Sequence, residues 1–304
     1  MAVTAEAVKQ LRERTGAGMM ECKKALVETN GDLDAAAELM RKSGLAKADK
    51  KASRVAAEGV IVIERSPDAK RAVIVEVNCE TDFVARENDF KGFATAVAKA
   101  ALANRPTSLD ALLAAKADGG TLDEVRRALI AKIGENISVR RFQVIEAPAI
   151  VGAYLHGSRI GALVAMKSGD DAVAKDIAMH VAAINPARVS AAEVPADEVA
   201  KEREIQLAQA KGDPKNAGKP EEIVAKIIEG KIRKWLNEVT LLGQPFVKDP
   251  DQSVEKYLKQ AGGEVAAFVR FEVGSGIEKK QEDFAEEVRK QVESMKTPPT
   301  GKTH

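Results

Sequence analysis

Residues 75–90 read Val-Glu-Val-Asn-Cys-Glu-Thr-Asp-Phe-Val-Ala-Arg-Glu-Asn-Asp-Phe, and this stretch decides how the middle of the chain folds. The apolar run 72–77 predicts a strand, residues 78–82 a polar loop, and the apolar spacing from Phe90 onward a helix. A loop between a strand and a helix lies at an edge, where binding residues concentrate. Phe83 follows this loop, and the pattern alone leaves open whether it faces a partner or caps the local core.

Outward from this stretch, the sequence predicts an α+β core whose second half repeats the first. The order strand, acidic loop and helix at 72–101 returns at 160–183, which indicates an internal duplication. The second loop carries no Phe at its tip, so the two loops are expected to differ in role. The other predicted core elements are strands at 60–63, 139–145, 150–154 and 265–273, turns at 66–69 and 156–158, and helices at 122–133 and 254–258.

The N-terminal residues predict a separate bundle of three short helices. Apolar residues recur at helical spacing in each predicted helix, and Thr15 to Gly18 and Asn30-Gly31 separate the helices. Ser43-Gly44 is expected to end the third helix, before a basic, Ala-rich connector.

An insertion between the second copy and its last strand predicts an antiparallel helical hairpin, or coiled coil. Charged helices at 195–211 and 221–235 flank a turn rich in Gly and Pro, and their apolar stripe is narrow. The predicted organisation is a three-helix domain at 1–54, a core N-subdomain at 55–147, a core C-subdomain at 148–186 and 233–275, the hairpin at 187–232, a C-terminal helical module at 276–296 and a disordered tail at 297–304.

The composition limits the classes of partner. Lys and Arg number 47 and Asp and Glu 46, so a net charge of +1 gives no general attraction to nucleic acid or to an anionic membrane. No apolar run approaches the roughly 20 residues of a membrane span, and the N-terminus lacks a signal-peptide pattern. Cys22 and Cys79 offer no disulfide framework or zinc spacing, so we expect reduced thiols and a cytoplasmic protein.

The sequence offers no catalytic constellation. It has three histidines, of which His180 lies on an apolar helix and predicts a core residue, while His156 lies in a turn and is a candidate functional residue. Metalloprotease, phosphate-loop and nucleophile-elbow motifs do not occur. We therefore predict a protein that is no enzyme and that has no metal site and no cofactor.

Six segments in the same order resemble the translation elongation factor Ts family along nearly the whole chain. One short motif can match by chance, whereas six in the right order are highly specific. The matching segments are Leu11 to Met20, Cys22 to Leu26, Glu76 to Ala85, His156 to Gly161, Gly243 to Val247 and Phe271 to Gly274.

The resemblance implies a guanine-nucleotide exchange factor for the GTPase elongation factor Tu, with a ubiquitin-associated-like N-terminal domain. It implies that Thr81, Asp82, Phe83 and Val84 enter the GTPase near its magnesium site. Other implied or candidate contacts are Arg12, Met19, Met20, His156 and Gly157. Two other classes stay open: an adaptor that binds peptides or ubiquitin-like partners through the helical domain, and a nucleic-acid-binding factor, which the near-zero charge disfavours.

Overall fold

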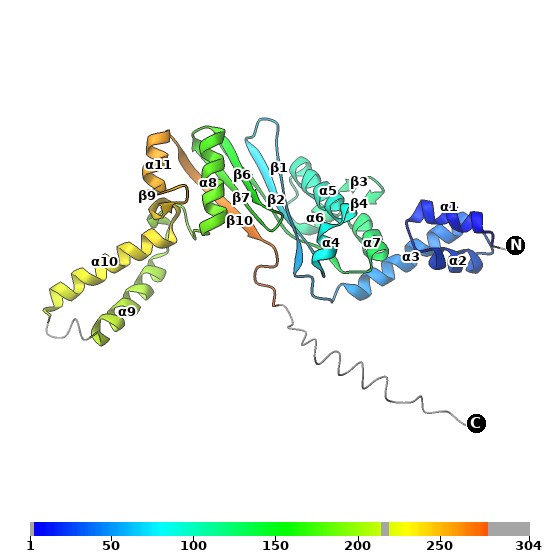
Figure 1. The fold of residues 1–304 in the computed structure, drawn as a ribbon, viewed down its shortest axis with the longest axis horizontal. Helices are drawn as coiled ribbons and strands as arrows, with labels where there is room; N and C mark the ends of the chain where they lie inside the picture. The colour runs from blue at the N-terminus through cyan, green and yellow to red at the C-terminus, as the bar shows by residue number, and fades with distance from the viewer. Residues whose placement is uncertain (1–2, 214–218, 279–304) are drawn as a thin grey trace, which may run out of the picture.

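The structure, a computed structural model, describes residues 3–213 and 219–278. The amphipathic helix predicted around Phe284 and the tail 297–304 lie outside these ranges. The described chain is elongated: a helical bundle lies at one end, a pair of long helices at the other, and two sheets between them (Figure 1). The predicted α+β class with three N-terminal helices is confirmed.

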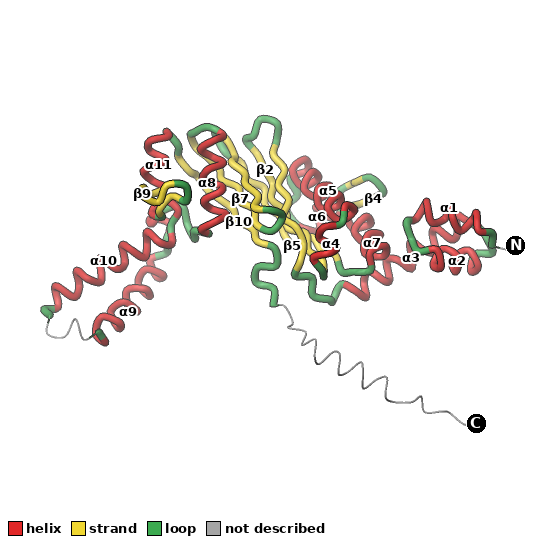
Figure 2. The backbone as a smooth tube through the Cα atoms, viewed as in Figure 1, coloured by secondary structure: helices red, strands yellow, loops and turns green. Residues whose placement is uncertain are grey.

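The centre of the molecule is a sandwich of two three-stranded antiparallel sheets. The first has the order β1 (Glu58–Arg65), β2 (Arg71–Cys79), β5 (Ile137–Glu146), and the second the order β10 (Glu264–Glu272), β7 (Ile160–Ser168), β6 (Ile150–His156). Their inner faces meet in an apolar layer that includes Ile61, Ile74 and Leu163. Because side chains alternate along a strand, Val73 and Val75 point the other way and pack with helix residues on the outer face. Helices cover both outer faces, so the core has four layers (Figure 2).

The two halves repeat one topology. In each sheet the second strand lies in the middle, and a helix that follows it packs on the outer face. The first half contains β1 (Glu58–Arg65), β2 (Arg71–Cys79), α4 (Asp82–Arg86), α5 (Asn88–Asn104), α6 (Leu109–Leu113), β3 (Lys116–Ala117), β4 (Gly120–Thr121), α7 (Leu122–Ile133) and β5 (Ile137–Glu146). The second half contains β6 (Ile150–His156), β7 (Ile160–Ser168), α8 (Asp171–Ile184), β8 (Pro245–Phe246), β9 (Asp249–Ser253), α11 (Val254–Ala261) and β10 (Glu264–Glu272). Helix α4 has no counterpart in the second half.

The N-terminal bundle consists of α1 (Ala5–Thr15), α2 (Met19–Glu28) and α3 (Leu33–Lys51), packed around Leu11, Cys22 and Leu26. The prediction that Ser43-Gly44 ends the third helix is wrong, because α3 continues without a break to Lys51. A Cβ at Gly44 would lie 3.2 Å from the Ala131 Cβ of α7. The glycine therefore serves a close approach of two helices rather than a helix end.

The long α3 joins the bundle to the core. Ala48, near its end, is buried in the apolar cluster that also contains Phe90 of α5. The predicted domain boundary at residue 54 lies just after the end of α3, but the last turns of α3 already pack in the core.

The inserted hairpin consists of α9 (Ala196–Gly212) and α10 (Glu221–Val239), which begin directly after Pro195 and Pro220. Its buried seam is small, as predicted, with Ala210, Ile228 and Ile232 at its centre. An Arg203–Glu229 ion pair bridges the two helices. Helix α10 runs past the expected boundary at 232 as far as Val239, so the hairpin and the second half share one continuous helix.

His180 of α8 is a fully buried core residue, as the sequence predicts. The Val247 backbone N–H donates to its Nδ1 at 3.2 Å, so the ring proton resides on Nε2 and is donated to Gln244 Oε1 at 2.9 Å. Burial lowers the pKa of His180 from its ordinary value of 6.5, against the opposing hydrogen bond to Gln244. The neutral ring therefore holds the segment 244–247 against α8.

The His180 arrangement predicts a pH-dependent stability. The unfolded chain takes up a proton at this residue near pH 6.5, and the folded chain only at a lower pH, so the free energy of unfolding falls as the pH drops below about 6.5. Between pH 7 and pH 5.5 the wild type should therefore lose more stability than His180→Gln, as measured by urea denaturation. At pH 8, the difference in the free energy of unfolding between the two proteins gives the packing cost of the substitution alone. If the free energy of unfolding depends on pH in the same way in both proteins, His180 is not the group that titrates.

Candidate functional site

The Thr-Asp-Phe-Val segment forms the short helix α4 and not the loop that the sequence predicts. Thr81 is its N-cap, with extended backbone, and its Oγ1 accepts from the Val84 N–H at 3.4 Å. Glu87, whose backbone is also extended, is the C-cap of α4 and the N-cap of α5. The segment therefore has one defined backbone conformation at the end of the central strand β2.

Phe83 projects from this helix into solvent. Its side chain is 75% exposed, more than any other large apolar side chain that the structure describes. The alternative that Phe83 caps the local core is therefore wrong. Val84 and Ala85, its neighbours, are buried against the core and anchor α4. Of the four predicted site residues, Val84 thus holds the helix in place and Asp82 and Phe83 face outward.

Asp82 lies in the first turn of α4 and forms an i,i+4 ion pair with Arg86 at 2.7 Å. Both side chains are at least half exposed, so the pair contributes little to stability and can be exchanged for another partner. The sequence analysis did not single out Arg86, although its spacing of four from Asp82 on a helix is a signal for this ion pair.

Cys79 lies beneath the turn. Its buried thiol donates to the Thr81 carbonyl at 3.1 Å. Burial, together with the carboxylates of Glu135, Glu58 and Asp82, raises the pKa of Cys79 to about 12. The thiol is therefore protonated at neutral pH and acts as a small packing residue with a hydrogen-bond donor.

The predicted contacts of the N-terminal bundle lie on its surface. Arg12 is exposed at the end of α1, and Met19 and Met20 are 58% and 67% exposed at the start of α2. Val27, which the sequence analysis did not single out, is 60% exposed. It lies two helical turns after Met20 on the same face of α2, so this face presents several apolar side chains to solvent.

The predicted contacts of the second half lie at the β6–β7 hairpin turn. His156 ends β6 and is exposed, and the Tyr154 hydroxyl lies 3.3 Å from its Nδ1. Gly157 occupies the left-handed region with φ of +59°, which a glycine adopts without strain. The Ser158 carbonyl accepts from the Ile61 N–H of β1 at 2.8 Å, so this turn is fixed against the first sheet.

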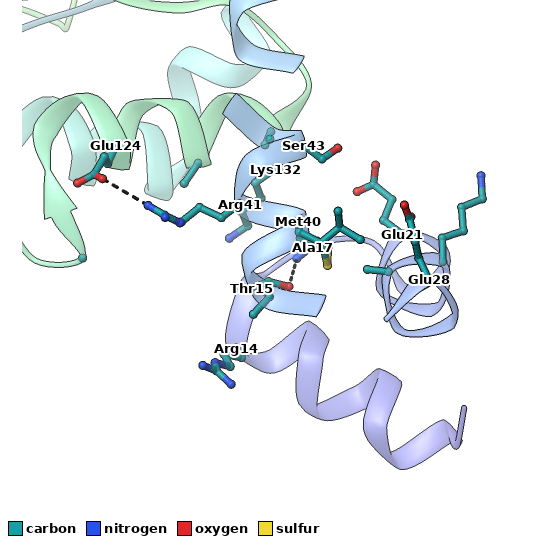
Figure 3. A pocket seen from close by; sticks show the side chains of 18 residues that line it. Arg14, Thr15, Ala17, Glu21, Glu28, Met40, Arg41, Ser43, Glu124 and Lys132 are labelled. Carbon is teal, nitrogen blue, oxygen red and sulfur yellow. Dashed lines mark hydrogen bonds and ion pairs between the residues drawn. The ribbon is translucent and has the colours of Figure 1, made fainter. Parts of the chain in front are cut away.

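A separate cleft of about 680 Å³ lies between the N-terminal bundle and α7. Its lining carries both signs of charge, including Arg41 and Glu124, which form an ion pair at 3.6 Å across it (Figure 3). None of the predicted site residues lines this cleft. It marks the junction between the bundle and the core.

The predicted site residues therefore lie on three separate parts of the molecule: α4, the outer surface of the bundle, and the β6–β7 turn. No side chain of these groups is buried in a shared pocket, and each group is presented to solvent. Such an arrangement suits docking on a large partner. Among residues 3–213 and 219–278, none of the helices combines the length and the hydropathy of a membrane span.

Comparison with known proteins gives one consistent family. The family model for elongation factor Ts matches residues 80–275. An elongation factor Ts of Thioalkalivibrio sulfidiphilus is 58% identical over 294 residues, which cover 96% of this chain and 99% of that protein. One of Halorhodospira halophila is 57% identical, with 96% and 99% covered, and one of Legionella pneumophila 56% identical, with 95% and 98% covered. By both the family model and these full-length matches, the chain belongs to the elongation factor Ts family.

Proposed function

We propose that this protein is a guanine-nucleotide exchange factor that binds the GDP form of elongation factor Tu in the cytoplasm and accelerates GDP release. The observation that carries the proposal is the solvent-exposed Phe83 on a helix with a fixed backbone, in a chain that belongs to the elongation factor Ts family. Nucleotide exchange makes and breaks no covalent bond, so the function needs no catalytic residues.

The proposed mechanism follows from how a GTPase holds its nucleotide. Backbone amides and a magnesium ion neutralise the phosphates of GDP. A protein that binds better to a state with these contacts loosened shifts the GTPase toward that state. Nucleotide and exchange factor then weaken each other's binding by the same factor. By the same reciprocity, GTP that binds afterwards weakens the binding of the factor and so releases it from the GTPase.

Phe83 acts as the wedge in this proposal. A rigid aromatic ring inserted between two elements of the partner changes their packing and gains the free energy of burying a side chain that is exposed in the free protein. Asp82 lies one residue away and brings a carboxylate toward the magnesium site. Arg86 holds that carboxylate in the free protein and releases it at little cost.

The other exposed groups supply affinity. We propose that Arg12, Met19 and Met20 dock the N-terminal bundle on the GTPase, and that His156 and Gly157 form a second contact from the other half of the core. Contacts at several points stabilise a distorted partner better than one contact does, because each adds binding free energy to the same state. The near-zero net charge supports a protein partner over nucleic acid.

The proposed wedge role of Phe83 can be tested directly. Phe83→Ala should slow GDP release at saturating factor by at least about tenfold, a loss of roughly 1.4 kcal/mol of coupling, while the melting temperature stays near that of the wild type. The measurement is stopped-flow release of a fluorescent GDP from elongation factor Tu. His156→Ala is the contrasting variant: it should lower affinity more than the maximal rate. An unchanged maximal rate for Phe83→Ala would refute the wedge.

A second prediction separates the Asp82 carboxylate from its ion pair. Asp82→Asn should reduce the maximal rate in the presence of magnesium and much less after chelation, because the proposed role is electrostatic. Arg86→Gln removes the same ion pair but keeps the carboxylate, so it should retain wild-type exchange. If the Asp82→Asn defect is as large without magnesium as with it, the carboxylate does not act through the ion.

A third prediction concerns docking of the bundle. Deletion of residues 1–50 would remove Ala48 from the core and destabilise it, so point variants are the cleaner test. Met19→Ser with Met20→Ser should weaken binding to the GTPase by roughly 1–3 kcal/mol at an unchanged melting temperature, since truncated apolar contacts at an interface cost about this much. Isothermal calorimetry measures it. Leu207→Ser, on the exposed side of α9, is the matched control, and equal affinities for all three proteins would remove α2 from the interface.

A further inference from the structure

The loop between α7 and β5 connects two parts of the molecule that the sequence separates. Glu135 and Asn136 lie in this loop, half-buried and buried respectively. One side chain bonds to the turn that begins α4, and the other to the chain that leaves α3.

Glu135 holds the first residues of the α4 turn. Its Oε2 accepts from the backbone N–H groups of Glu80 and Thr81, at 3.2 and 3.0 Å, and its Oε1 accepts from the Thr81 hydroxyl at 2.7 Å. The same hydroxyl accepts from the Val84 N–H and so caps α4. The Glu135 carboxylate therefore fixes both the backbone of residues 80 and 81 and the side-chain rotamer of the cap residue Thr81.

Asn136 holds the chain that leaves the N-terminal bundle. Its side-chain N–H group donates to the carbonyls of Arg54, at 2.7 Å, and Ala52, at 3.4 Å. Its backbone N–H donates to Glu80 Oε1 at 2.6 Å, and the Arg54 guanidinium lies 3.5 Å from the same carboxylate. The turn before α4, the loop after α7 and the chain after α3 are thus joined in one hydrogen-bonded unit.

We propose that Glu135 and Asn136 are positioning residues that brace Phe83 against the N-terminal bundle, so that docking of the bundle places the wedge. The inference rests on the exchange function proposed above. Neither residue needs to touch the partner for this role. Glu135 sets the orientation of α4 and therefore the maximal rate, whereas Asn136 sets the placement of the bundle relative to α4 and therefore the affinity.

The physical reason is that a wedge acts only in a defined orientation. Loss of the carboxylate leaves two backbone N–H groups and the Thr81 hydroxyl without their acceptor, and a half-buried turn then opens toward water. Phe83 would remain present but would sample several orientations, which lowers its differential affinity for the distorted GTPase.

Three variants test the role of Glu135. Glu135→Ala should lower the maximal rate of GDP release about tenfold with a change of less than about threefold in the half-saturating concentration. Glu135→Gln keeps an acceptor at the Oε2 position and should retain most of the rate. Asp170→Ala removes a capping carboxylate of matched chemistry, which accepts from the Val173 N–H at the start of α8, and should leave the rate unchanged.

Asn136→Ala should show the converse behaviour: a half-saturating concentration raised about tenfold and a maximal rate within about threefold of the wild type. A wild-type rate for Glu135→Ala, or equal loss in Glu135→Ala and Glu135→Gln, would overturn the positioning role of Glu135. Equal losses of rate for Glu135→Ala and Asn136→Ala would overturn the division between them.

Amide hydrogen exchange of the free protein separates failure of this inference from failure of the proposed function. Glu135→Ala should increase the exchange of residues 80–86 about tenfold or more, and Glu135→Gln and Asp170→Ala should not. If the wild type fails to release GDP but this pattern holds, the brace stands and the exchange function is wrong. If the amides of residues 80–86 exchange equally in all these proteins, the brace does not exist.

Discussion

The buried carboxylate of Glu76 is the interaction on which the rest of the core depends. It lies on the central strand β2 and is fully buried. Burial alone would raise the pKa of Glu76, but hydrogen bonds from the Gly274 N–H and from Arg141 and Arg140 outweigh it, and the pKa is lowered. A buried charge of this kind is tolerated only with such partners, and loss of both arginines would leave it without a compensating charge, at a cost of about 3–5 kcal/mol.

The Glu76 network joins elements that the sheets alone would not join. Arg140 and Arg141 come from β5, and Gly274 follows β10 of the other sheet. Arg141 also stacks on Phe271 at 4.2 Å and donates to the Glu272 carbonyl. These contacts fix the end of β10 to the central strand of the first sheet. The charged cluster of Glu76, Arg140 and Arg141, called the clamp below, borders the apolar layer between the two sheets.

This packing supports the role proposed for α4. The helix follows β2 directly, and β2 is held on both sides by neighbouring strands, on one face by α5 and at Glu76 by the clamp. The proposed wedge acts only if Phe83 is held in a defined orientation, and a base of this kind provides that support. The bundle and the hairpin, by contrast, lie at the far ends and have small apolar cores of their own (Figure 1).

The sequence by itself determined the fold class, the duplicated order of strands and helices, the buried role of His180 and the family, because apolar periodicity and local motifs are properties of neighbouring residues. It failed where distant segments decide the outcome. Gly44 predicts a helix end by propensity, but packing against Ala131 keeps α3 helical. The turn at Thr81 becomes a helix because Val84 finds a buried site and Glu135 caps the backbone from 54 residues away. Only the tertiary structure decided that Phe83 faces solvent, since burial depends on what the rest of the chain leaves uncovered.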